Sequence, residues 1–318
     1  MKRLSAFTGA LILSIFTLAS LSAVEWPVED KSPDSIISYF GQNVGGKIST
    51  SLIFTKPPKK PAARSSNQAK KIATEEEEEQ EEIQNVKAVK DGTILIIMSE
   101  LDDDSEFFPS ALGTSVILAH DDDIISVYSN LDTQSVWENT ENKSTLSEGD
   151  LIGHTGNTGW QQNSSTLEFQ IIDNQKATAI NPVIFLPRTE KEADYTFTGV
   201  VLQNKSGTFF DLRESKVFPA GTYRVYHTRN KTTMPYKMTC SINGVIEDEI
   251  AFDTITLQNG KLYINGKDKR YNSEILFPDE DLIFTGELTL TPGKSTLGLT
   301  AESFLGKQKQ LNYILSIY

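Results

Sequence analysis

The sequence predicts an almost entirely β protein. Short runs rich in β-branched and aromatic residues alternate with Gly, Asn, Asp and Pro, which is typical of strands joined by tight turns. Outside a charged segment described below, no stretch keeps a helical period of apolar residues over three turns. The expected strands cover residues 93–99, 115–120, 124–131, 166–172, 195–202, 222–228, 237–242, 261–266, 282–290, 296–302 and 312–318.

The first residues have the features of a secretory signal peptide. Lys2 and Arg3 precede an apolar run that ends near Leu21, and the small residue Ala23 follows, which predicts a signal peptide at residues 1–23. The run is shorter than the ~20 apolar residues of a membrane-spanning helix, and no later segment is apolar enough to span. We therefore expect an exported protein of the periplasm or cell envelope, with no stable membrane span after cleavage.

Two changes of composition mark the limits of the expected domains. Residues 58–85 are rich in Pro and Lys and then in Glu, and they offer no apolar face to bury, which predicts a flexible charged insertion. The polar segment 188–194 separates a first domain, residues 24–190, from a second series of strands at residues 191–318. The closely spaced turn signals of that second series predict an immunoglobulin-like β-sandwich. Its tyrosines are candidates for a carbohydrate surface, with core or rim packing as the preferred interpretation: Tyr223, Tyr226, Tyr236, Tyr263 and Tyr271.

Charge and cysteine content exclude some classes of protein. The formal net charge of -13 at pH 7 argues against nucleic acid as a partner, because no basic surface offsets the repulsion of phosphates. The single cysteine, Cys240, cannot form an internal disulfide, and its strand-like surroundings predict a small buried core residue. Stability is therefore expected to come from packed cores rather than from cross-links.

An ordered series of short motifs runs from Phe40 to about Pro187. Their order and spacing resemble those of the lysostaphin/LytM-type zinc endopeptidases, which cut peptide cross-bridges in bacterial cell walls. The resemblance implies the antiparallel β-sheet core of that family for the first domain. The motifs are Phe40-Gly41, Phe54 with Pro57, Asp91-Gly92, the run from Val116 to His120, Tyr128 to Leu131, the glycine run Gly149 to Gly159, Thr166 to Gln170, and Asn181-Pro182.

Carried over residue by residue, the resemblance leaves the metal site of the family without its ligands. The family's zinc ligands, two His and one Asp, correspond to Ser49, Ile53 and Glu168, and its two partner histidines correspond to Asn130 and Thr166. The placement of the last motif assumes a one-residue insertion in the preceding loop, and without it the positions become Ser165 and Leu167. Zinc sites use thiolate, imidazole or carboxylate, and Ile53 supplies none of these. We therefore expect no zinc and no catalytic residues, because no metal-activated water and no general base remain.

Three histidines and one acidic run are the remaining candidates for a metal site. A zinc site rebuilt from His120, His154 and His227 is disfavoured by ligand count and geometry. The run Asp121 to Asp123 is interpreted as a solvated turn, with weak calcium binding as the alternative.

The leading hypothesis is an exported, catalytically inactive peptidase-like protein. It binds peptidoglycan or regulates a cell-wall hydrolase such as an amidase, a role that the resemblance implies because inactive members of the family activate amidases. Two alternatives stay open: an active cell-wall zinc endopeptidase with non-standard ligands, and a structural envelope protein whose C-terminal part mediates attachment. The expected binding groove is lined by Tyr128, Asn130, Thr158, Trp160 and Glu168.

Overall fold

The computed structural model describes residues 24–57, 83–99, 110–160, 165–188, 192 and 194–318. The predicted signal peptide and all but the last three residues of the predicted insertion lie outside this part of the chain. Asn85 already belongs to a strand, so the fold resumes within the predicted limits of the insertion. None of the helices in the described residues is long and apolar enough to cross a membrane.

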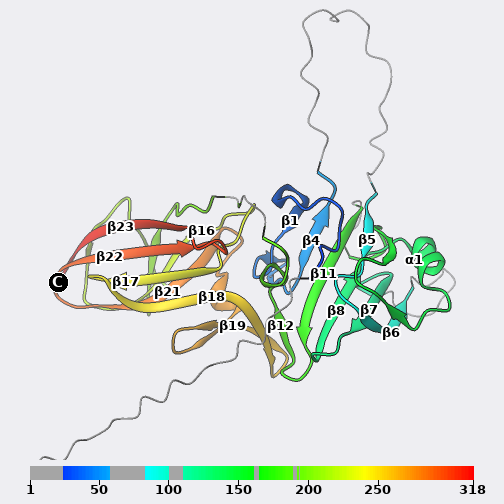
Figure 1. The fold of residues 1–318 in the computed structure, drawn as a ribbon. Coiled ribbons are helices and arrows are strands. Elements are labelled where there is room, and N and C mark those ends of the chain that lie inside the picture. The colour runs from blue at the N-terminus through cyan, green and yellow to red at the C-terminus, as the bar shows by residue number, and fades with distance from the viewer. Residues whose placement is uncertain (1–23, 58–82, 100–109, 161–164, 189–191, 193) are drawn as a thin grey trace, which may run out of the picture.

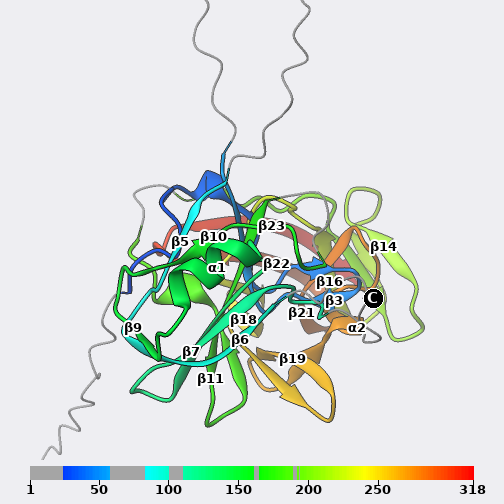
Figure 2. The same ribbon diagram turned by 90° about the vertical axis from the view of Figure 1, so that its right-hand side faces the viewer.

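The prediction of an almost entirely β protein is confirmed, and the strands form two groups that lie side by side (Figure 1). The first group, with α1 at the end away from the second, contains the motif series described above; Figure 2 views the molecule from that end. Its elements are η1 (Pro33–Ser35), β1 (Ile36–Ser38), β2 (Asn43–Val44), β3 (Lys47–Ile48), β4 (Leu52–Thr55), β5 (Asn85–Lys87), β6 (Gly92–Met98), β7 (Ser115–Ala119), β8 (Ile124–Ser129), α1 (Thr133–Thr140), β9 (Thr145–Leu146), β10 (Leu151–His154), β11 (Thr166–Asp173), β12 (Thr178–Ile180) and η2 (Pro182–Ile184).

An antiparallel sheet in the order β12-β11-β8-β7-β6-β9 forms the centre of the first group. Strand β4 pairs with the first half of β11, and β12 pairs with its second half, so the two share one edge of β11 while β8 occupies the other. Along β11, Leu167 and Phe169 are fully buried on the core face, as their alternation predicts. The intervening residues therefore point to the opposite face.

The second group consists of two packed sheets. One has the order β14-β13-β16-β21, and the other has the order β15-β23-β22-β17-β18, which β19 and β20 extend. A buried cluster joins the two, with Leu202, Val225 and Leu288 from the first sheet and Cys240 and Leu299 from the second. This arrangement is a β-sandwich, while the finer immunoglobulin-like assignment stays a prediction. The elements are β13 (Val201–Asn204), β14 (Phe209–Asp211), β15 (Val217–Phe218), β16 (Gly221–Thr228), β17 (Lys237–Ile242), β18 (Val245–Gln258), β19 (Lys261–Gly266), β20 (Arg270–Asn272), α2 (Ser273–Leu276), β21 (Leu282–Leu290), β22 (Gly293–Glu302) and β23 (Gln308–Ile317).

Several buried side chains behave as their sequence context predicts. Cys240 is a free, fully buried cysteine, and burial raises the pKa of its thiol, which keeps the thiol protonated. Tyr223, Tyr226 and Tyr271 are at most 3% exposed, so they pack in the core rather than forming a carbohydrate surface.

The two groups share one core and one sheet. Strand β12 pairs with β18, with Ile180 opposite Thr254. The largest buried cluster contains residues of both groups, and Phe252 of β18 packs so closely on Gly41 that a Cβ there would lie 2.6 Å from its ring. Asn181 donates from Nδ2 to the carbonyl oxygen of Phe252 at 2.8 Å. We therefore expect the two groups to unfold together.

The two longest elements that were not predicted from the sequence are helix α1 and strand β18. Helix α1 is only one eight-residue segment, too short to show three turns of periodicity, and Asp132 caps it by accepting from the backbone N–H of Ser135 at 2.8 Å. Strand β18 is the longest in the second group, but its acidic start conceals the alternation. The prediction of a strand at 195–202 is wrong over most of its length, because only Val201 and Leu202 belong to β13.

Candidate functional site

The candidate site lies on the face of β11 opposite its core-facing side chains. Strands β4, β11 and β8 lie side by side (Figure 1). Glu168 of β11 is paired with Ile53 of β4 on one side and with Ser129 of β8 on the other, so the three residues form one row across the three strands. Ser49 lies just before β4, and its hydroxyl is 3.3 Å from the hydroxyl of Ser51. The structure thus brings together the three residues that correspond to the zinc ligands in the resemblance.

The carboxylate of Glu168 is held by neutral hydrogen-bond donors. Ser51 donates from its hydroxyl to Oε1 at 2.9 Å, and the indole N–H of Trp160 donates to Oε2 at 2.8 Å. Gln170 donates from Nε2 to Oε1 at 3.3 Å. Glu168 itself is only 7% exposed. Both carboxylate oxygens therefore already accept hydrogen bonds, and a metal ion would have to displace these donors.

Asn130 and Thr166, which correspond to the partner histidines, serve to hold the glycine run in place. Asn130 has φ 64, a left-handed conformation that Asn adopts more readily than most residues. Its Nδ2 donates to the carbonyl oxygen of Gly156 at 2.8 Å and to the hydroxyl of Thr166 at 2.7 Å, and its Oδ1 accepts from the backbone N–H of Gly159 at 2.7 Å. Both side chains are 1% exposed. Both side chains therefore belong to the hydrogen bonding that holds the glycine run in place.

Most of the residues predicted to line a groove have structural roles instead. Tyr128 is fully buried and packs on the core face against Phe169, with ring centroids 5.2 Å apart, because it is paired with a core-facing position of β11. Burial raises the pKa of Tyr128 to about 12. The hydroxyl of Thr158 donates to the carbonyl oxygen of Leu131 at 2.9 Å and accepts from the backbone N–H of Thr114, which is a structural role. Of the five predicted groove residues, Trp160 is the one with a large exposed fraction, 47%.

The three histidines do not form a second site. His120 lies between the carbonyl oxygen of Asp91 and the hydroxyl of Ser126, at 2.7 and 2.8 Å from its two ring nitrogens. His154 belongs to β10 and His227 to β16. Over residues 24–57, 83–99, 110–160, 165–188, 192 and 194–318, no group of three or more His, Cys, Asp or Glu side chains is placed to hold a metal ion.

The acidic run Asp121 to Asp123 forms a turn whose carboxylates have protein partners. Asp122 pairs with Lys90 at 2.7 Å, and Asp123 accepts from Nε2 of Gln175 at 2.6 Å. This arrangement agrees with the preferred interpretation as a solvated turn.

Two residues of the site were missed in the sequence. Ser51 and Gln170 both donate to Glu168, and each is two residues from a position that the resemblance identified, Ile53 and Glu168 respectively. The period of two along a strand places such neighbours on the same face, so this signal was available. The whole arrangement is a metallopeptidase-like sheet in which a serine, an isoleucine and a fully hydrogen-bonded glutamate occupy the ligand positions.

Comparison with known proteins agrees with this description. Residues 72–182 match the model of peptidase family M23, which agrees with a degenerate, LytM-type domain in this part of the chain. A second family model matches residues 194–318. An uncharacterized protein of Treponema pallidum is 26% identical over 155 residues, which cover 48% of this chain and 90% of that protein.

Among solved structures, similarity is confined to about half of the chain. A chain of the SpoIIIAH–SpoIIQ complex is 17% identical with a TM-score of 0.36, over 51% of this chain and 99% of that chain. A zinc containing peptidase from Vibrio cholerae is 12% identical with a TM-score of 0.32, over 55% of this chain and 40% of that one. Values of this size carry no information about activity.

Proposed function

We propose that the protein is an exported, catalytically inactive peptidase-like protein that binds peptidoglycan or regulates a cell-wall hydrolase. The observation that carries this proposal is the hydrogen-bonding of Glu168, whose carboxylate is taken up by Ser51, Trp160 and Gln170. A catalytic zinc site needs three protein ligands and an open position for water, and Ile53 has no atom that binds zinc. The residues present do not fit the metal of the family, so no hydrolytic step is derived for them.

The part of this site available to a partner is the indole ring of Trp160. Its N–H is fixed on Glu168 at 2.8 Å, and Glu168 is fixed in turn by neighbouring donors. A ring held in one orientation loses little conformational freedom when a ligand stacks on it, which favours binding. Contact with a wall polymer or a wall enzyme is therefore the function that this surface supports best.

We expect the purified protein, prepared without added zinc, to contain substoichiometric zinc and to leave wall peptides intact. Metal analysis of the full chain, together with chromatography of peptidoglycan fragments after incubation, measures both. The matched variant is Glu168→Gln, which removes the one carboxylate among the three ligand positions while keeping its shape. Stoichiometric zinc that Glu168→Gln loses, accompanied by peptide cleavage, would establish the alternative of an active endopeptidase with non-standard ligands.

Replacement of Trp160 is expected to weaken binding to isolated peptidoglycan sacculi by about tenfold, which corresponds to about 1.4 kcal/mol. Co-sedimentation of the full chain with sacculi measures this, and Trp160→Ala is compared with Trp137→Ala. Trp137 lies on α1 and is 48% exposed, against 47% for Trp160, so it is a matched control for the general loss of an exposed indole. Equal losses in the two variants would mean that Trp160 has no specific role.

Regulation of a hydrolase is tested with a purified cell-wall amidase whose rate is measured with and without the protein. A change in rate that Trp160→Ala abolishes supports the regulatory form of the proposal. Binding to neither sacculi nor amidase would remove the proposed function altogether.

The alternative of a structural envelope protein has to be tested with surface substitutions rather than with a truncation. Deleting residues 194–318 would strip the shared core of Phe252, Ile250 and their neighbours, so loss of localisation would report misfolding. Substitutions of exposed side chains on the outer face of the sandwich leave this core intact, so loss of localisation in such variants would report a lost contact.

A further inference from the structure

The outer face of the sheet formed by β18, β17, β22 and β23 is hollowed and lined mainly by uncharged polar side chains. The hollow has a volume of about 370 Å³. Strand pairing places Thr239, Thr300 and Gln310 in one row across the sheet. Adjacent strands lie about 4.8 Å apart, so the four strands span about 14 Å, enough for an extended polymer segment.

The next row of this face contains a glycine, and the side chains of its two neighbours lie over it. Ser241, Gly298 and Asn312 are paired across β17, β22 and β23. A Cβ at Gly298 would lie 2.6 Å from the hydroxyl oxygen of Ser241 and 3.1 Å from Oδ1 of Asn312. The side chains of Ser241 and Asn312 therefore already occupy the space above Gly298, which leaves no room for a Cβ there.

Most hydrogen-bonding groups at the centre of the face are unused. The side chains of Thr239, Thr300, Gln310 and Asn312 make no hydrogen bond with any residue that the structure describes. Ser241 donates weakly to the carbonyl oxygen of Gly298, at 3.3 Å. The face thus offers hydroxyl and amide groups that both donate and accept.

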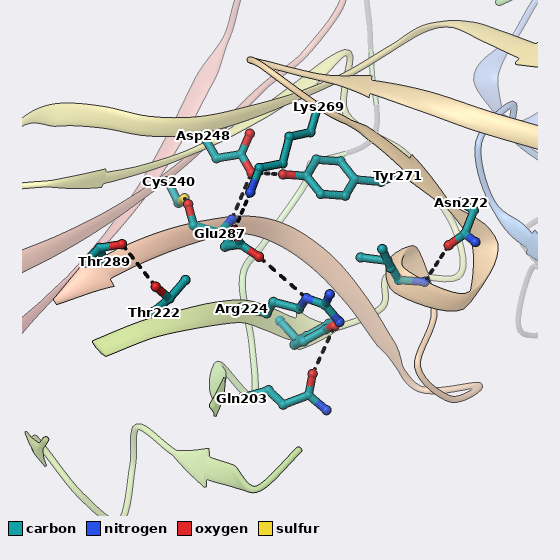
Figure 3. A network of polar contacts seen from close by, with 12 residues as sticks. Gln203, Thr222, Arg224, Cys240, Asp248, Lys269, Tyr271, Asn272, Glu287 and Thr289 are labelled. Carbon is teal, nitrogen blue, oxygen red and sulfur yellow. Dashed lines mark hydrogen bonds and ion pairs between the residues drawn. The ribbon is translucent and has the colours of Figure 1, made fainter. Parts of the chain in front are cut away.

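The outer face of the other sheet provides an internal comparison, because its polar groups are paired with one another (Figure 3). There the hydroxyl groups of Thr222 and Thr289 are 3.4 Å apart, and the hydroxyl of Tyr226 donates to Gln203 at 3.4 Å. Arg224 lies 3.8 Å from Glu287. A hollow of similar size is present on that face, and the charged pair Arg224 and Glu287 belongs to its lining.

The charges around the open face indicate what kind of ligand it takes. Lys237 pairs with Glu249 at 3.3 Å, and Glu302 accepts from Nε2 of Gln308 at 3.0 Å. With one Lys and two Glu, the lining carries a formal charge of -1, which disfavours polyanions in a protein that is acidic overall. Sugar hydroxyl groups and acetamido groups match Ser, Thr, Asn and Gln side chains, since each partner both donates and accepts.

We propose that this face binds a neutral glycan strand bearing hydroxyl and amide groups. The binding surface is the hollow centred on Gly298, with Thr239, Thr300, Gln310 and Asn312 as its hydrogen-bonding groups. This inference rests on the proposed function and extends it to a second surface. It can be tested separately, because these residues belong to the other group of strands and are far along the chain from Trp160.

The test is a calorimetric titration of the full chain with a β-1,4-linked tetramer of N-acetylglucosamine. We expect a Kd of about 1 mM or tighter, and at least a roughly tenfold weakening in the double variant Gln310→Ala with Asn312→Ala. Both side chains are exposed, so their removal should leave folding intact. Thr289→Val, on the face whose groups are already paired, is the control and is expected to bind like the wild type.

Three results would overturn the inference. They are no heat of binding at millimolar tetramer, equal affinity in the double variant, and tighter binding of heparin or of another copy of the chain on the same face. Sacculus binding that depends on Trp160 while the tetramer fails to bind would remove this inference and leave the proposed function standing. Tetramer binding without any effect of Trp160 on sacculus binding would support this inference and would show that Trp160 is not the residue through which the protein binds sacculi.

Discussion

Replacement of Asp248 by alanine is expected to lower the free energy of unfolding by about 3–5 kcal/mol, near the upper limit for single substitutions. Asp248 lies on β18 and is 4% exposed. Its carboxylate gathers donors from several strands, as Figure 3 shows in part, and alanine would leave them without an acceptor in a partly buried site. The donors are the hydroxyl of Tyr271 at 2.5 Å and the backbone N–H groups of Glu249 at 2.8 Å, Glu287 at 2.9 Å and Lys267 at 3.3 Å.

Chemical denaturation followed by circular dichroism measures this loss. Asp248→Asn keeps the shape and one acceptor oxygen, so it should cost less than Asp248→Ala, whereas Thr289→Val on the exposed face should change stability by less than about 0.5 kcal/mol. A cost below about 1 kcal/mol for Asp248→Ala would show that water replaces the carboxylate.

Tryptophan fluorescence adds a second readout of the same variant. Trp26, Trp137 and Trp160 are the three tryptophans of the chain and precede the second group of strands, in which Asp248 lies. Because the largest core cluster runs through both groups, the fluorescence transition should shift together with the circular dichroism transition. Separate transitions would contradict the shared core.

The same buried carboxylate explains the main failure of the sequence-based prediction. Strands such as β11, β16 and β21 were predicted because their buried positions are apolar. In β18 the alternation of buried residues starts at Asp248 and continues through Ile250 and Phe252, so an acidic residue occupies a core position. The register then shifts before Ile255, which breaks the period once more. Nothing in the local sequence shows that three donors from elsewhere in the chain, Tyr271, Glu287 and Lys267, would make burial of this carboxylate favourable.

The sequence predicted those parts of the site that depend on the pairing of strands. The family resemblance identified Ser49, Ile53 and Glu168, and the pairing of β4 with β11 does bring them together. The assignment of Tyr128 to the groove was wrong, because which face it occupies depends on its pairing with Phe169. The contact between Trp160 and Glu168 joins a loop to a strand, and no periodicity in the sequence fixes that distance.

Stability is also expected to fall as the pH decreases from about 6.5, because of His227. This residue is fully buried on β16, with its ring nitrogens 2.6 Å from the hydroxyl of Tyr195 and 2.7 Å from that of Thr285. The ring of Phe197 packs against it with centroids 4.8 Å apart. Burial in this neutral environment lowers the pKa of His227 to about 3 from a usual value of 6.5.

The sign of the effect follows from the protons that each state binds. Below pH 6.5 the unfolded chain protonates this histidine and the folded chain does not, so falling pH favours unfolding until the pH reaches the folded value near 3. The limiting slope is about 1.4 kcal/mol per pH unit, which gives a loss of about 2 kcal/mol between pH 7.5 and pH 5.

Carboxylates also titrate in acid, so the histidine contribution must be isolated by difference. His227→Asn retains a neutral polar group but has no imidazole to protonate when unfolded, and it should therefore lose the part of the slope that His227 supplies. The expected result is that the stability difference between wild type and His227→Asn shrinks by about 2 kcal/mol from pH 7.5 to pH 5. Thr289→Val, which removes no titratable group, is the control and should keep its difference from wild type constant. If the difference for His227→Asn stays constant over the same range, His227 is protonated in the folded protein as readily as in the unfolded chain. That outcome would contradict its surroundings, because two hydroxyl groups and an aromatic ring supply no negative charge to stabilise a protonated imidazole.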